Sequence, residues 1–254
     1  MQEPANVFGP ERRRMLRAAA LALLALSVAP LSACAGRTAA AAANAGPARI
    51  GVIGSGRIGG TVGGLWVKAG HPVLFSSRHP EALKPLVDGL GPLARAGTVA
   101  EAIAFAEVLF LATPYHALPQ LSQENAGAWS GKIVLDATNA IVQRDGAIAD
   151  EAQRNGIGIT TAKYLRGARV VRAFNFMGAT NFANLHHRSG GLIAVPIAGD
   201  DEAALQVAAQ LVRDAGFEPV VVGPLASADK FAPGGPLFRQ IGTAEEFRGK
   251  MSGQ

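Results

Sequence analysis

The feature that most constrains this chain is a short apolar strand followed at once by a glycine-rich turn. Residues 48–59 read Ala-Arg-Ile-Gly-Val-Ile-Gly-Ser-Gly-Arg-Ile-Gly, and Gly54, Gly56 and Gly59 have the spacing G-x-G-x-x-G. In such a turn the first glycine lets the chain bend, the second lets a pyrophosphate approach the backbone, and the third lets the next helix pack on the strand. The segment therefore predicts a strand, a phosphate-binding loop and a helix.

The residues around the loop strengthen this interpretation, because three glycines alone match by chance in a chain with 31 glycines. Apolar residues recur at helical spacing from Ile58 to Ala69, Gly70 ends the helix, and a second strand is expected over 72–76. This order favours dinucleotide binding over a purely structural turn. We expect cofactor contacts from the loop and the first helical turn, namely Gly54, Ser55, Gly56, Arg57, Ile58 and Gly59.

The end of the second strand indicates which dinucleotide is bound. An NAD site places Asp or Glu there, but this chain reads Ser76-Ser77-Arg78. The two hydroxyls can donate hydrogen bonds, and the Arg78 guanidinium can bind a 2′-phosphate. NADP(H) is therefore favoured over NAD(H). The alternative is a solvated turn before a helix expected over 80–90.

The first 34 residues resemble an export signal. Arg12, Arg13 and Arg14 precede an apolar run over 18–31, which is followed by Leu-Ser-Ala-Cys ending at Cys34. This ending is similar to a bacterial lipobox, so Cys34 is the expected lipid anchor, residues 35–47 a tether, and the protein an exported lipoprotein. The arginines resemble a twin-arginine signal. The general secretory route, or a later start that leaves the protein in the cytoplasm, stays open.

Apolar runs over 108–112, 132–136 and 169–173 each end in a polar cluster, and further strands are expected over 192–198 and 218–222. Strands that alternate with helices predict an α/β fold with a doubly wound parallel sheet, whose ligands lie beyond the carboxyl ends of the strands. We assign residues 48–225 to a Rossmann domain and residues 226–254 to a small C-terminal extension. Residues 199–201, Gly-Asp-Asp, are expected to form the turn and N-cap of a helix over 201–215.

Nucleic acid is excluded as a partner by charge and composition. Without residues 1–34 the chain keeps 20 Lys and Arg against 17 Asp and Glu, and it has only two Trp and two Tyr with which to stack bases. We expect a small-molecule redox acceptor, a membrane contact only through the lipid anchor, and no metal; a homodimer stays open.

The chain resembles the coenzyme F-420-dependent NADP reductases and the NADPH-binding domain of the STEAP metalloreductases. The later Val-Val-Arg-Ala-Phe-Asn and Gly-Pro-Leu stretches are the most specific part of the resemblance. The matching segments are residues 50–59, 77–78, 111–115, 133–139, 170–175, 197–201, 215–220 and 223–228.

The resemblance implies hydride transfer from NADPH to a deazaflavin or flavin, which requires proximity rather than a general base. By position, Thr113 and Pro114 would lie at the nicotinamide ribose, with Ala112 beside them, and Tyr115 and His116 would wall the ring pocket, unless His116 is only a solvated loop residue. Asn139 and Asn175 would hydrogen-bond the carboxamide or the acceptor, unless they only form turns. The alternatives are a non-enzymatic NADP(H)-binding module, a component of a metal reductase chain, and a dehydrogenase for a small carbonyl or imine.

Overall fold

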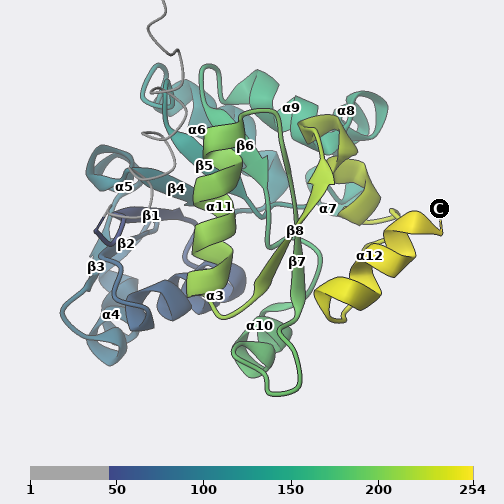
Figure 1. Cartoon of the computed structure of the whole chain (residues 1–254). Coiled ribbons are helices and arrows are strands. Elements are labelled where there is room, and N and C mark those ends of the chain that lie inside the picture. The colour runs from purple at the N-terminus through teal and green to yellow at the C-terminus, as the bar shows by residue number, and fades with distance from the viewer. Residues whose placement is uncertain (1–45, 254) are drawn as a thin grey trace, which may run out of the picture. The chain divides into compact units, whose positions relative to one another are not determined.

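The structure, a computed structural model, describes residues 46–253, so Cys34 and the predicted export signal lie outside the described residues. An eight-stranded sheet has the order β3-β2-β1-β4-β5-β6-β7-β8, and helices cover it (Figure 1). The strands are β1 (Ile50–Ile53), β2 (Val73–Ser76), β3 (Ala94–Gly97), β4 (Val108–Leu111), β5 (Ile133–Asp136), β6 (Arg169–Arg172), β7 (Ala194–Gly199) and β8 (Glu218–Gly223). The first six strands have the order of a doubly wound nucleotide-binding fold, which confirms the predicted fold class.

The helices pack on both faces of the sheet. They are α3 (Arg57–Lys68), α4 (Lys84–Leu90), α5 (Val99–Phe105), α6 (Leu118–Glu124), α7 (Val142–Asp145), α8 (Ala147–Asn155), α9 (Ile157–Tyr164), α10 (Ala179–Leu185), α11 (Glu202–Asp214) and α12 (Ala244–Ser252). Successive β1 residues face opposite sides: Gly51 lies against α5, whereas Val52 lies against α3. Strands covered on both faces are mostly apolar, and all four residues of β1, β2, β4 and β5 are buried, including the polar Ser76 and Asp136 at the ends of β2 and β5.

The last two strands depart from the predicted parallel sheet. Strand β7 runs antiparallel to β6, and only its end pairs with that strand, with Val171 opposite Gly199 and Arg172 opposite Ala198. The chain leaves β6 at its carboxyl end and returns through α10, so β7 begins beyond that end and runs back towards it. Strand β8 is parallel to β7. The carboxyl edge of the sheet is therefore extended on one side by β7.

One local prediction also needs correction. Residues 80–90 form a 3₁₀ helix, η1 (Pro80–Leu83), followed by α4, instead of one continuous helix. Pro85 has no N–H to donate to the carbonyl one turn earlier, so the two helices are separate. Residues after 225 form η3 (Leu225–Phe231), whose Leu225, Ala228 and Phe231 are buried against the sheet core. The boundary at residue 226 stays a prediction.

The cap of α11 predicts how acid affects stability. Asp201 accepts the Ala204 N–H at 2.8 Å, which confirms the predicted cap, and it accepts two bonds from Arg169 at 2.8 and 2.6 Å. Arg169 and the N–H groups of the cap lower the pKa of Asp201 to about 2. Its stabilising contribution is thus present above the unfolded pKa of about 3.9 and is lost as the pH falls towards 2.

We expect the free energy of unfolding to fall between about pH 4 and pH 2, with a shallower slope in Asp201→Asn. Asparagine is also a good cap, so this variant removes the charge and retains an acceptor oxygen. Urea unfolding measured across this pH range tests the expectation. Equal slopes for the two proteins would contradict it.

Candidate active site

The glycine loop after β1 has the stereochemistry that its sequence predicts. Gly54 has a φ of +93°, and a Cβ there would lie 2.7 Å from the Thr113 methyl group. A Cβ on Gly59 would lie 2.1 Å from the Gly54 carbonyl oxygen, so only glycine allows this close approach of helix and loop. A Cβ on Gly56, in contrast, would meet nothing within 4 Å. Gly56 therefore leaves open the surface that a pyrophosphate needs.

Helix α3 begins at this open surface. Its N-cap is Gly56, no described side chain caps it, and its first turn contains no acidic residue. The first backbone N–H groups of a helix have no partner inside the helix, and the helix dipole favours negative charge there. Arg57, at the first helical position, is exposed and adds a positive charge. The N-terminus of this 12-residue helix is thus suited to bind phosphate.

The end of β2 lies beside the loop, because the Ser55 N–H and hydroxyl both donate to the Ser76 carbonyl, at 3.3 and 3.1 Å. Ser76 itself is fully buried and its hydroxyl donates to the Val52 carbonyl at 2.8 Å. Ser76 therefore holds β2 to β1 and offers no free donor, which differs from its predicted role. The side chain of Ser77 is less buried, and its hydroxyl accepts the His79 N–H at 3.0 Å.

Arg78 is the charged group at this strand end. It is exposed, and among residues 46–253 it makes no hydrogen bond or ion pair. A free guanidinium next to the glycine loop is suited to bind a phosphate on the adenosine ribose.

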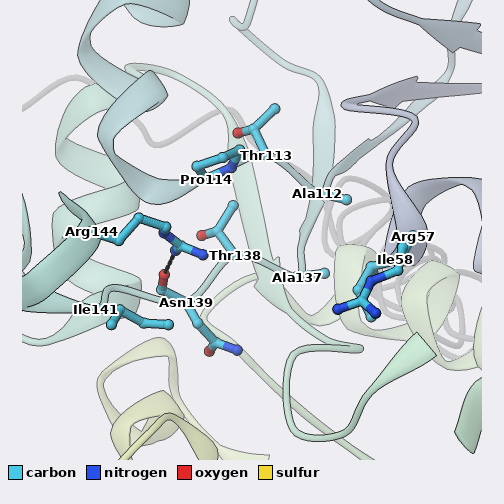
Figure 2. A pocket seen from close by; sticks show the side chains of 10 residues that line it. All are labelled: Arg57, Ile58, Ala112, Thr113, Pro114, Ala137, Thr138, Asn139, Ile141 and Arg144. Atoms are coloured by element: carbon cyan, nitrogen blue, oxygen red, sulfur yellow. Dashed lines mark hydrogen bonds between the residues drawn. The ribbon is translucent and has the colours of Figure 1, made fainter. Parts of the chain in front are cut away.

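A pocket of about 430 Å³ opens beyond the carboxyl ends of β4 and β5 (Figure 2). It adjoins the first turn of α3, so it continues from the phosphate-binding surface. The pocket brings together six predicted site residues, namely two from the start of α3, three that follow β4 and one that follows β5, along with four residues that the sequence did not indicate. It is lined by Arg57, Ile58, Ala112, Thr113, Pro114, Ala137, Thr138, Asn139, Ile141 and Arg144.

The floor of the pocket rests on a buried ion pair. Arg172 donates to Asp136 at 2.5 Å, and neither side chain is exposed to solvent. Arg172 also donates to the Thr138 carbonyl at 2.5 Å, and the Thr138 N–H and hydroxyl donate to Asp136. The Thr161 hydroxyl donates at 2.8 Å to Asp136 Oδ2, the carboxylate oxygen that Arg172 also contacts, whereas Thr138 donates to Oδ1. The pair thus fixes the loop that carries Thr138 and Asn139.

Two asparagines predicted as site residues lie together at this edge. The Asn139 amide donates to the Asn175 carbonyl at 2.7 Å, and the Asn175 amide donates to Asn139 Oδ1 and to the Phe231 carbonyl, at 3.2 and 3.1 Å. Asn175 Oδ1 and the Thr113 hydroxyl are buried without a hydrogen-bond partner in the described part of the chain. Four other buried polar atoms of the described residues also lack a partner, so these two atoms fit a ligand at this edge without requiring one.

The structure does not place Tyr115 at the pocket. Its side chain is fully buried, and its hydroxyl donates to the Ile157 carbonyl at 3.1 Å and contacts Thr161 Oγ1 at 3.3 Å. Burial raises the pKa of the Tyr115 phenol well above its usual range. The 3₁₀ helix η2 (Tyr115–Ala117) turns this ring into the core. Tyr115 therefore anchors the loop after β4 and does not wall a ring pocket.

His116 is half-exposed next to the pocket and bonds a buried carboxylate. The ring Nδ1 of His116 lies 2.9 Å from Asp145 Oδ1, and the backbone N–H of His116 donates to the same oxygen at 3.2 Å. Arg144 donates to both oxygens of Asp145, at 2.9 and 2.8 Å. Sequence reasoning missed Arg144 and Asp145; the signal for them was a pair of opposite charges soon after the polar end of β5.

The residues present fit an NADP(H) cofactor. The Gly56 surface and the α3 N-terminus offer a phosphate site, Arg78 offers a second, and Thr113 and Asn175 have buried atoms without a partner among the described residues. Within residues 46–253, no three His, Cys, Asp or Glu residues form a group that could hold a metal. No helix in this range is long and apolar enough to cross a membrane.

The chain is similar to known proteins in sequence and in fold. Residues 49–140 match the family model described as NADP oxidoreductase coenzyme F420-dependent. The chain is 30% identical over 188 residues to the rat metalloreductase STEAP3, covering 71% of this chain and 35% of that protein. It therefore spans about a third of the length of this curated relative.

Two solved structures are similar. A hypothetical protein from Sinorhizobium meliloti is 27% identical with a TM-score of 0.66, covering 78% of this chain and 96% of that one. A candidate F420-dependent NADP reductase from Arthrobacter sp. FB24 is 25% identical with a TM-score of 0.61, covering 70% and 86%. The glycine loop, the end of β2 and most of the residues that line the pocket lie within residues 49–140, the part of the chain that matches the coenzyme F420-dependent NADP oxidoreductase family model.

Proposed function

We propose that this protein is an NADP(H)-dependent oxidoreductase that transfers hydride between NADPH and a flavin or deazaflavin acceptor. The observation that carries the proposal is the continuous surface from the open Gly56 backbone to the pocket beyond β4 and β5. One end of this surface fits phosphates, and the other has room for flat rings. The nicotinamide supplies the hydride chemistry when it is bound, and the protein supplies position and a site with little water.

The chain's own residues would divide this work by place. The α3 N-terminus and Arg57 would bind the pyrophosphate, whereas Arg78 and Ser77 would bind the phosphate on the adenosine ribose. The cofactor would supply hydrogen-bond partners for the buried Thr113 hydroxyl and for Asn175 Oδ1. The Asp136–Arg172 pair holds the pocket floor rigid through Thr138. No general base is required, because hydride passes directly between the two rings.

The turnover test uses the purified full chain with NADPH and a panel of acceptors: FMN, FAD, riboflavin and the deazaflavin. The proposal predicts oxidation of NADPH, followed at 340 nm, by at least one of them. Tight binding of NADPH without oxidation by any acceptor would contradict the proposal and favour a non-enzymatic binding module.

Arg78→Ala should remove the preference for NADPH over NADH. A charge-assisted bond to a phosphate contributes about 1.5–3 kcal/mol, so NADPH affinity should fall by about 10-fold to 100-fold while NADH affinity is retained. Fluorescence titration of both cofactors measures this. Arg95→Ala removes an exposed positive charge from the neighbouring strand β3 and is the matched control. An equal loss in both variants would mean that general charge, and not Arg78, sets the preference.

A further inference from the structure

We propose that Arg144 determines acceptor specificity by binding an anionic phosphate or carboxylate group that the second substrate carries beside its redox ring. The inference rests on the proposed function, and it adds the chemical class of the acceptor.

The charges that line the pocket are the first support. Arg57 and Arg144 are the ionisable side chains among the ten residues that line it as the structure describes it, and none of the ten is acidic. Arg57 belongs to the first turn of α3, beside the phosphate site. Figure 2 shows Arg144 on the other side of the pocket, next to Asn139 and Ile141. A cofactor phosphate at α3 accounts for Arg57, and it leaves Arg144 without an assigned ligand.

Arg144 is held in one orientation. Its Nε donates to Asp145 Oδ1 at 2.9 Å, and its Nη2 donates to Asp145 Oδ2 at 2.8 Å and to the Asn139 carbonyl at 2.6 Å. Its Nη1 makes no hydrogen bond to any described residue, and the side chain is 42% exposed. The bonds of Nε and Nη2 therefore fix the direction of the two Nη1 N–H groups, and these remain available to a ligand. A donor fixed in advance loses little conformational entropy when it binds an anion.

Asp145 keeps this arrangement charged. Its side chain is fully buried, and it also accepts the Ile141 N–H at 2.8 Å and two bonds from His116. Burial raises the pKa of Asp145, but the hydrogen bonds from Arg144, Ile141 and His116 outweigh it and hold the pKa well below its usual range. Because the carboxylate balances the arginine charge, selectivity would come from the directed Nη1 donors rather than from net charge.

FMN and riboflavin form a matched pair of probes, because they share one ring system and differ in a phosphate group. We would titrate the full chain, saturated with NADP⁺, with each flavin and follow the quenching of flavin fluorescence. The unaltered protein should bind FMN at least about 10-fold more tightly than riboflavin. Arg144→Gln should bring the two affinities within about 2-fold by weakening FMN alone, and Arg144→Lys should retain part of the difference.

The control is Arg154→Gln, which removes an exposed arginine of α8 that does not line the pocket. This variant should retain the full preference for FMN. The inference is overturned by an unchanged preference in Arg144→Gln, by the absence of flavin binding while NADP⁺ binds, or by a loss of NADP⁺ affinity in Arg144→Gln, which would assign Arg144 to the cofactor. Absence of NADP⁺ binding to the unaltered chain would instead contradict the proposed function, and the inference with it.

Discussion

Gly56→Ala should fold like the unaltered protein and bind NADPH about 100-fold more weakly, which corresponds to about 2.7 kcal/mol. A Cβ on Gly56 would meet nothing within 4 Å, and the backbone there, with φ −74° and ψ −157°, is accessible to alanine. The methyl group would instead occupy the surface where the pyrophosphate has to approach the backbone. Fluorescence titration with NADPH, together with thermal unfolding, measures both effects.

Two neighbouring glycines are controls for this variant. Gly60→Ala places a Cβ 3.7 Å from the Ser55 carbonyl oxygen and 3.8 Å from the Leu86 side chain; these are ordinary van der Waals contacts, so NADPH affinity should be unchanged. Gly59→Ala would force a Cβ to 2.1 Å from the Gly54 carbonyl oxygen and should disturb the loop and lower stability. If Gly56→Ala bound NADPH as tightly as Gly60→Ala does, the loop would not be the phosphate site.

Arg172→Met should destabilise the fold by about 3–5 kcal/mol, because it leaves Asp136 buried without its cation. Methionine is apolar and unbranched, so it fills much of the space of the arginine side chain. The variant also loses the bond to the Thr138 carbonyl, so the pocket floor should loosen. Urea unfolding at neutral pH gives the size of the change.

The double variant Asp136→Leu with Arg172→Met distinguishes two causes of the loss of stability: a buried Asp136 carboxylate without its cation, and lost side-chain packing. Replacing both members of a buried ion pair by apolar residues is often neutral, so the double variant should recover much of the loss. The double-mutant cycle then yields a coupling energy between the two positions. A double variant no more stable than Arg172→Met alone would show that the pair does not act as a unit.

The first half of the fold could be predicted because its signals are local. The β1–loop–α3–β2 unit shows in the apolar runs and in the glycines that end them. Strand β3, with the sequence Ala-Arg-Ala-Gly, was missed because a short edge strand needs no apolar run. The antiparallel direction of β7 was missed because it depends on where the chain returns after α10, which no local pattern indicates.

The site was predicted where it depends on strand ends and missed where it depends on distant pairs. Thr113, Pro114 and Asn139 were found because each follows a buried strand. The Asp136–Arg172 pair joins residues 36 positions apart, and His116 and Asp145 lie 29 apart, so neither contact shows in a local pattern. A charged residue inside the apolar β6 run was the available signal for Arg172. Tyr115 was misplaced because sequence does not say which way a turn directs an aromatic ring.

The central claim is that this chain binds NADP(H) through the glycine loop and distinguishes it from NAD(H) by Arg78. The most direct measurement is a fluorescence titration of the purified full chain with NADPH and, in parallel, with NADH. The account predicts saturable binding of both, with NADPH bound at least about 10-fold more tightly. Equal affinities would contradict the role of Arg78, and the absence of binding to either cofactor would contradict the account as a whole.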